Sequence, residues 1–250
     1  MPEPDGATYP DPSTYPNGWL WVNGNPSYLV ASGSNVTEQK NQIVGVGVSG
    51  SVYSYSSNSG FFVYPTGAPY PQTGGAILAV PALTYAGVTN ATAQTTSINP
   101  FGGAFSFFVV VTPTGTLTSR YVINSDDAVQ GAIWVNASGL WEVQYHDFTN
   151  APVTSAVTAV AGTPVLLTMT MTYPAGNIAL QLDGTTIATA TGLTTGGGAG
   201  ASRVNLMGYQ SGHNLAGALG DVYLTTDCKT GSDLLNLNRY FGAKYGITVP

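Results

Sequence analysis

Charged side chains are scarce in this sequence. Asp, Glu, Lys and Arg together make up 7% of its 250 residues, whereas a typical soluble domain carries about 25%. Acidic residues outnumber basic ones by 12 to 6, which gives a net charge of −6. A nucleic-acid-binding surface needs a basic patch or stripe, so we expect no nucleic-acid partner.

Cysteine and long apolar runs are also missing. The single cysteine, Cys228, excludes a disulfide framework and a cysteine-based zinc site within one chain. No stretch approaches the roughly 20 consecutive apolar residues of a membrane helix, so we expect no membrane partner. The first residues, Met-Pro-Glu-Pro-Asp-Gly, lack the basic and apolar regions of a secretory leader, and we expect none.

Suitably spaced catalytic carboxylates are a further absence. A glycosidase needs two carboxylates that flank the scissile bond. The three glutamates are spread along the chain, and no two of them are spaced to share one face of a strand. Glu142 shares a strand face with Gln144 and His146, but a glutamine cannot replace an acid. His146 and Asp147 would point to opposite faces of a strand. We therefore expect that the chain is not an enzyme.

Short strands with alternating side chains are what the sequence does contain. Between residues 165 and 173, every second residue from Leu167 to Tyr173 is apolar or aromatic, and the residues between them are mostly threonines. The segment from Phe105 to Val111 alternates in the same way. A period of two is typical of a β-strand and differs from the stripe of an amphipathic helix.

Turn signals separate these strands. Asn23-Gly24 predicts a hairpin that joins Trp19–Val22 to Ser27–Ala31. Asp183-Gly184 predicts a second hairpin, and residues 137–139 predict a short loop with glycine at its last position.

One helix is expected near the C-terminus. Ser232 can cap its first turn, and it ends near Gly242 or Gly246. Three apolar residues at spacings i, i+3 and i+7 form its apolar stripe: Leu234, Leu237 and Phe241. Many strands with one terminal helix predict an all-β fold, a two-sheet antiparallel jelly-roll sandwich.

The chain divides into three expected parts. Residues 1–18 carry five prolines and predict an extended arm that becomes ordered on a partner. Residues 19–80 predict a β-rich anchor or assembly segment. Residues 81–250 predict the sandwich itself.

Four segments of the last third resemble the concanavalin A-like, laminin-G-type jelly roll. They are Ile178–Gly184, Arg203–Gly208, Leu215–Tyr223 and Tyr240–Ile247. Asp183 and Gly184 match the turn of the family's "lyvDG" hairpin, while Gly217 and Asp221 match its "f.G.idev.iy" strand. The match covers residues 82–250. It implies a two-sheet sandwich that often binds carbohydrate and is often a module of a larger protein.

The layout and the charge-poor composition, rich in Gly, Thr and Ser, also resemble bacteriophage virion proteins, such as capsid decorations and head or tail fibres. This resemblance implies a structural protein of the virion surface. It would form a homo-oligomer, contact other virion proteins of the capsid or tail, and display a lectin-like domain toward a host-surface glycan. A free-standing bacterial glycan-binding module is the alternative, and a glycoside hydrolase is a lesser one.

Sugar binding needs exposed aromatic faces with polar groups beside them. The candidates are Trp134, Tyr145, His146, His213 and Asn214. The alternative is that the tryptophans, Trp134 and Trp141, fill the core of the sandwich.

We expect no cofactor, with calcium as the alternative. Ca²⁺ prefers oxygen ligands from Asp, Asn and backbone carbonyls. The candidate metal ligands are Asn124, Asp126 and Asp127, although no Asp-x-Asp-x-Asp-Gly run is present.

The leader is rich in aromatic residues, which are favoured at the cores of protein interfaces. The candidate assembly residues are Trp19, Trp21, Tyr53, Tyr55, Phe61 and Phe62. The alternative is that these rings cover the jelly roll's own edge.

Overall fold

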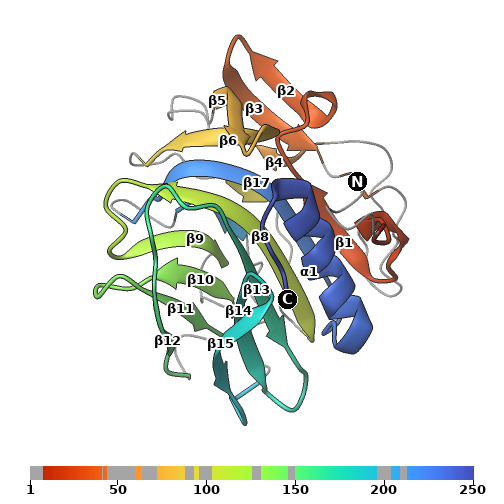
Figure 1. The fold of residues 1–250 in the computed structure, drawn as a ribbon, viewed down its shortest axis with the longest axis vertical. Coiled ribbons are helices and arrows are strands. Elements are labelled where there is room, and N and C mark those ends of the chain that lie inside the picture. The colour runs from red at the N-terminus through yellow and green to blue at the C-terminus, as the bar shows by residue number, and fades with distance from the viewer. Residues whose placement is uncertain are drawn as a thin grey trace.

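The computed structural model describes residues 8–40, 42–43, 60–63, 72–87, 93–95, 103–125, 131–145, 150–195, 204–208 and 213–250. Within them lie seventeen strands, one α-helix and two short 3-10 helices, at Pro12–Thr14 and Pro26–Tyr28. The strands form two antiparallel layers with the α-helix against one of them (Figure 1). The prediction of an all-β, two-sheet sandwich with one C-terminal helix is confirmed.

The first layer is built around β17. Its strands are β1 (Gly18–Val22), β6 (Val80–Ala86), β8 (Phe105–Thr114), β13 (Val165–Met171), β14 (Ile178–Leu182), β15 (Thr185–Ala190) and β17 (Ala216–Thr225). β1 and β6 pair with successive parts of β17, and β8 lies on its other side. β13, β14 and β15 follow β8 in that order.

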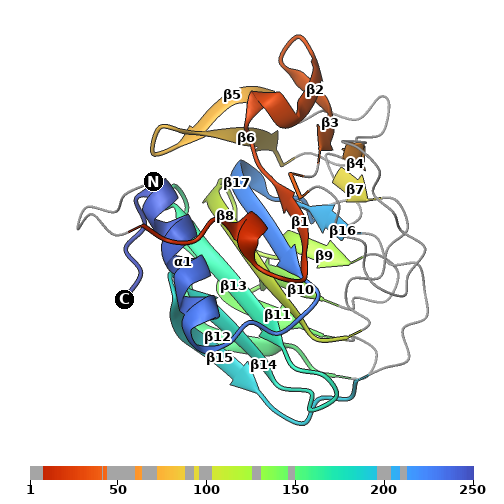
Figure 2. The ribbon, with the colours of Figure 1, turned by 90° about the vertical axis from the view of Figure 1, so that its right-hand side faces the viewer.

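The second layer runs in the order β12, β11, β10, β9, β16, β7, β4, β3 and β2. Their bounds are Val153–Thr158, Leu140–Gln144, Ala132–Val135, Arg120–Ser125, Val204–Leu206, Ala93–Thr95, Gly60–Val63, Asn35–Lys40 and Leu29–Ser32. β5 (Gln72–Ile77) pairs with both β6 and β3 and joins the layers. The β2–β3 and β5–β6 hairpins lie together at one end of the sandwich (Figures 1 and 2).

Alternating side chains of β8 and β13 enter two apolar clusters. Phe107 and Leu167 face the space between the layers, whereas Phe108 and Leu166 face the α-helix. Both faces of these two strands are therefore buried. This explains why the side chains that point toward α1, and not only those that point into the sandwich, are apolar or uncharged. The predicted inward faces are confirmed up to Met171, while Tyr173 lies beyond β13 and is 46% exposed.

The helix α1 (Gly231–Tyr245) covers the outer face of the first layer (Figure 2). Leu237 and Phe241 are buried against β8 and β13, as the apolar stripe predicts. The helix begins two residues earlier than expected, with Thr230 and not Ser232 at the N-cap, and ends at Gly246, whose φ of 63° requires a left-handed backbone. No helix within the described residues is long and apolar enough to cross a membrane.

A buried carboxylate, Asp221 of β17, fastens α1 and β1 to the sheet. Its side chain is 1% exposed. Asp221 Oδ1 accepts hydrogen bonds from Trp21 Nε1 at 2.6 Å and Asn23 Nδ2 at 2.8 Å. Its Oδ2 lies 2.6 Å from Lys244 Nζ in the last turn of α1. The ammonium also lies 5.7 Å from the centre of the Trp21 ring. The matched aspartate of the family motif therefore has a structural role here.

Two of the predicted turns are confirmed and one is wrong. Asp183 and Gly184 have φ values of 51° and 80°, as a tight hairpin turn requires, and Gly139 has a φ of 78°. The hairpin at Asn23-Gly24 does not form, because β1 pairs with β17 and not with β2. The hydrogen bond from Asn23 to Asp221 adds a side-chain contact at the end of the β1–β17 pairing.

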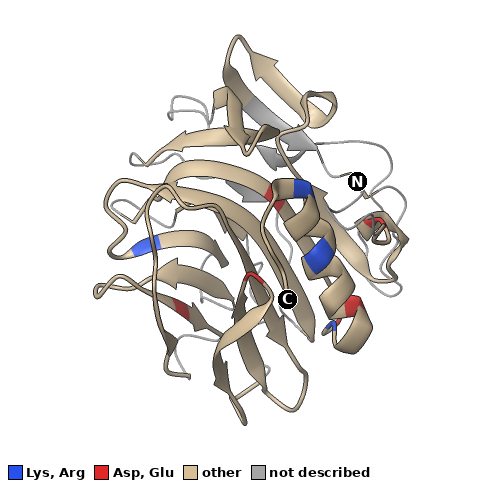
Figure 3. Cartoon of the chain, in the orientation of Figure 1, with Lys and Arg blue, Asp and Glu red and all other residues tan. Residues whose placement is uncertain are grey.

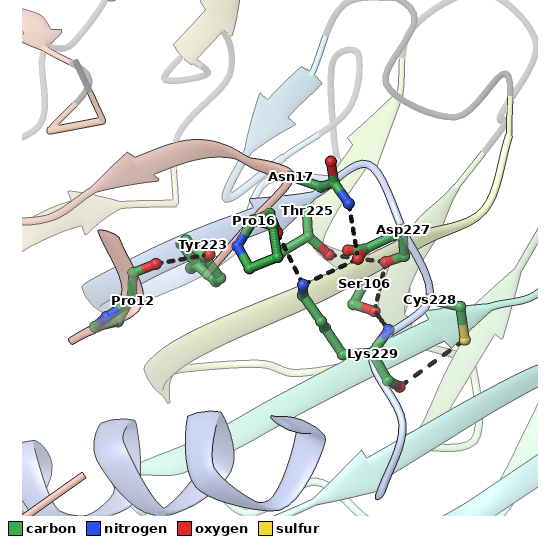
Figure 4. Close-up of polar contacts among 9 residues, drawn as sticks. All are labelled: Pro12, Pro16, Asn17, Ser106, Tyr223, Thr225, Asp227, Cys228 and Lys229. Carbon is green, nitrogen blue, oxygen red and sulfur yellow. Dashed lines mark hydrogen bonds and ion pairs between the residues drawn. The ribbon is translucent and has the colours of Figure 1, made fainter. Parts of the chain in front are cut away.

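The proline-rich segment before β1 packs onto the sandwich (Figure 4). Tyr223 Oη donates to the Pro12 carbonyl at 2.9 Å, and Lys229 Nζ donates to the Pro16 carbonyl at 2.9 Å. Lys229 is 3% exposed and forms an ion pair with Asp227 Oδ2 at 2.9 Å. Asn17 Nδ2 donates to the same oxygen at 3.1 Å. Residues 8–17 are thus part of the sandwich, which corrects the expectation of an arm that waits for a partner.

Candidate functional site

One row of side chains crosses the outer face of the second layer. Tyr121 of β9 is paired with Trp134 of β10, Trp134 with Glu142 of β11, and Glu142 with Thr154 of β12. The neighbours of Trp134 along β10, Ile133 and Val135, belong to the central core, whereas Trp134 packs in a separate cluster with Tyr121. This row therefore lies on the face that points away from the core.

Aromatic rings gather at one end of this row. The ring centroids of Tyr121 and Trp134 lie 5.5 Å apart and the planes are tilted by 32°. The ring of His213 meets Tyr121 edge-on at 6.1 Å. His213 Nδ1 lies 3.0 Å from the Ser119 carbonyl, and Asn214 bridges to the Tyr121 backbone. Three predicted sugar-binding residues are thus brought together around a tyrosine. Trp134 is 7% exposed and Asn214 is 2% exposed, so the open part of this cluster is formed by His213 and the partly exposed Tyr121.

The carboxylate of Glu142 continues the row. The residue is 8% exposed. Its Oε2 accepts hydrogen bonds from Asn136 Nδ2 at 2.8 Å and from Thr154 Oγ1 at 2.6 Å. Asn136 is itself fixed, because its Oδ1 accepts the backbone N–H groups of Ser138 and Leu140 in the β10–β11 loop. Neither of the two ion pairs within the described part of the chain involves Glu142.

A second row of amides lies beside the first. Asn205 of β16 is paired with Asn124 of β9, and Gln144 of β11 is paired with Ala132 of β10. Asn205 Nδ2 donates to Asn124 Oδ1 at 3.4 Å. Both asparagines are at least 97% buried, and Asn124 Nδ2 and Asn205 Oδ1 have no hydrogen-bond partner among the described residues. Because both atoms are shielded from solvent, they are not open to a ligand in this structure.

The other predicted sugar-binding residues do not join this face. Tyr145 is 2% exposed and lies in the core, where its ring centre is 6.1 Å from that of Phe105. This corrects the prediction for Tyr145. His146 lies outside the described residues. Trp141 fills the core, as the alternative interpretation held. The sequence analysis missed Tyr121. Its position opposite Trp134 depends on a register shift in the β9–β10 pairing, and no feature of the sequence indicates that shift.

The predicted metal ligands are only partly described. Asn124 lies within β9 and is fully buried. Asp126 and Asp127 lie outside the described residues. Among the residues that the structure describes, no three His, Cys, Asp or Glu side chains are grouped closely enough to hold a metal ion.

The predicted assembly residues have different positions. Trp19 and Trp21 are 4% and 7% exposed and belong to the two apolar clusters. They stabilise the sandwich itself, which corrects their assignment to an interface and agrees with the alternative that they cover the jelly roll's edge. Phe61 and Phe62 lie in β4. Tyr53 and Tyr55 lie outside the described residues.

No protein-family model matches this chain, and no curated protein sequence matches it. Among solved structures, the chain is similar to Trypanosoma rangeli sialidase in complex with the inhibitor DANA, with a TM-score of 0.61 and 13% identity. The similarity covers 95% of this chain and 35% of the sialidase. The binding domain of Paraclostridial Mosquitocidal Protein 1 is similar with a TM-score of 0.65 and 11% identity, over 92% of this chain and 53% of that one.

These likenesses show a shared fold. They agree with a concanavalin A-like sandwich and carry no link to a laminin-G domain or a bacteriophage. The chain spans about a third of the length of the sialidases that it matches. Sialidases are glycoside hydrolases, so this fold gives no ground for excluding hydrolysis. The expectation that the chain is not an enzyme is corrected by this finding.

Proposed function

We propose that the chain is a glycan-binding domain and that the row of Tyr121, Trp134 and Glu142 holds the sugar. The observation that carries this proposal is the juxtaposition of two aromatic rings with a hydrogen-bonded carboxylate on one sheet face. Pyranose rings pack on aromatic faces, while their hydroxyl groups donate to carboxylates and amides. His213 and Asn214 lie at the same end of the row and supply further polar groups.

A comparison with solved structures also supports a glycan ligand. Solved structures of similar fold include Trypanosoma rangeli sialidase in complex with sialic acid.

A glycan array followed by calorimetric titration tests this function. The full chain should bind a selective set of glycans, and Trp134→Ala should weaken the binding at least tenfold, or about 1.4 kcal/mol. Tyr173→Ala is the matched control, because Tyr173 is 46% exposed and lies after β13 in the other layer. Absence of selective binding, or equal losses in the two variants, would refute the proposal.

Hydrolysis is a second candidate function, favoured by the fold shared with sialidases and by the buried carboxylate of Glu142. The same glycans should be incubated with the protein and examined for new reducing ends. Turnover that disappears in Glu142→Gln would establish hydrolysis, whereas turnover that survives in this variant would assign the reaction to other residues.

We further propose that the domain is displayed on a bacteriophage virion, attached through the end that carries the β2–β3 and β5–β6 hairpins (Figure 1). The charge-poor composition and the exposed Val30 of β2 support this placement. Val30→Asp should reduce incorporation into particles, measured by mass spectrometry of purified virions, without unfolding the domain. Equal incorporation of the variant would contradict this attachment. A free-standing bacterial module would be found in no particle.

A further inference from the structure

We propose that Glu142 and the Trp134–Tyr121 pair bind a positively charged group, so that the preferred glycan carries a free amine. This inference rests on the proposed glycan-binding function and names the class of sugar. It follows from the hydrogen-bond partners of Glu142, from the rings beside it and from the charge of the whole protein.

Among the described residues, the carboxylate of Glu142 has no counter-ion. Two neutral donors, Asn136 Nδ2 and Thr154 Oγ1, both bond to Oε2. Oε1 accepts no hydrogen bond from the described residues, and none of their basic groups pairs with this carboxylate. The residue as a whole is 8% exposed. Buried carboxylates are normally paired with a cation, so an ammonium group on the ligand would supply the missing partner.

The two rings beside Glu142 favour the same kind of ligand. Trp134 lies directly across the strand pair from Glu142, where Cβ atoms are about 5 Å apart. Tyr121 lies on the other side of Trp134, with 5.5 Å between ring centres. The face of an indole or phenol ring attracts a cation through its quadrupole. An amine bound at Glu142 would therefore contact both the carboxylate and a π surface.

The charge of the whole chain acts in the same direction. Its net charge is −6. Figure 3 shows that charged residues of both signs lie on α1 in the described part of the molecule, and Lys244 of this helix is paired with Asp221. A negative protein repels acidic sugars and attracts cationic ones, and this steering weakens as salt is added. A sialic or uronic acid would place a second carboxylate beside Glu142.

Oligosaccharides of glucosamine and of N-acetylglucosamine, with the same length and linkage, provide the test. The first carries free amines and the second carries neutral amides at the same positions. A difference in the affinity of the protein for the two oligomers therefore measures the effect of the positive charge on the sugar. Titration of the full chain should give about tenfold tighter binding of the glucosamine oligomer, with a preference that shrinks at high salt. Tighter or equal binding of the acetylated oligomer would overturn the inference and leave the glycan-binding function intact. Binding of neither oligomer or any other glycan would overturn both.

Two variants locate the effect. Glu142→Gln keeps an oxygen that can accept from Asn136 and Thr154, and it should abolish the preference for the amine. Asp233→Asn changes the net charge equally at an exposed position in the first turn of α1 and should retain the preference. A preference that survives in Glu142→Gln would refute the assignment. If Glu142→Gln fails to fold, the salt dependence and the acetylation difference of the unmodified chain still decide the question.

Discussion

Replacing Lys244 by methionine removes the counter-ion of a buried carboxylate. Asp221 is 1% exposed, and its Oδ2 is 2.6 Å from Lys244 Nζ. Breaking a buried pair by removing one partner costs about 3 to 5 kcal/mol. Because Oδ1 keeps its bonds from Trp21 and Asn23, we expect the lower end of this range, about 3 kcal/mol of the free energy of unfolding. Methionine retains most of the apolar volume of the lysine stem, so packing changes little.

Urea denaturation, followed by tryptophan fluorescence, measures this loss. Arg239→Met is the control, since it removes one positive charge from a partly exposed position of the same helix and should cost only about 0.5 kcal/mol. A deficit of Lys244→Met below about 1 kcal/mol would refute the reasoning.

Three further outcomes follow from the described contacts. Burial raises the pKa of Tyr223 and of Tyr245 above the ordinary value of 10.0. The unfolded chain therefore loses these protons first, and the free energy of unfolding should fall as the pH rises past 10. Denaturation curves compared with tyrosinate absorbance measure this fall, and a free energy of unfolding that stays constant above pH 10 would contradict the prediction. Removal of residues 1–17 deletes the carbonyl groups that accept hydrogen bonds from Tyr223 and Lys229. The free energy of unfolding should fall by about 2 kcal/mol or more. A truncated chain with an unchanged melting temperature would show that the segment does not stabilise the sandwich. Asn136→Ala should weaken glycan binding several-fold in calorimetry by releasing Glu142, whereas full affinity would deny Asn136 this positioning role.

Alternation in the sequence was sufficient to predict the layers. The apolar faces of β8 and β13, the Asp183–Gly184 turn and the stripe of α1 all depend on neighbours within a few residues. The hairpin at Asn23-Gly24 failed for the opposite reason. β1 pairs with β17, where Asp221, 198 residues further along the chain, accepts a hydrogen bond from Asn23. A local turn signal cannot report a contact of that range.

The candidate site was predicted in part. Trp134 and His213 could be proposed from residue type alone. Their meeting around Tyr121 depends on a register shift in the β9–β10 pairing, and the contact of His213 depends on a segment 92 residues further along. The prediction that Tyr145 binds sugar was wrong because Tyr145 follows Trp141 by four residues along the chain. Residues an even number apart in a strand share a face, so Tyr145 points into the core with Trp141.

Indole N–H resonances offer the most direct test of glycan binding at Trp134. The chain has four tryptophans, and the other three, Trp19, Trp21 and Trp141, lie in the two apolar clusters. A bound glycan identified on the array should shift the resonance of Trp134, assigned from its loss in Trp134→Phe, and leave the other three in place. A titration in which the Trp134 signal stays still while binding saturates would contradict the account.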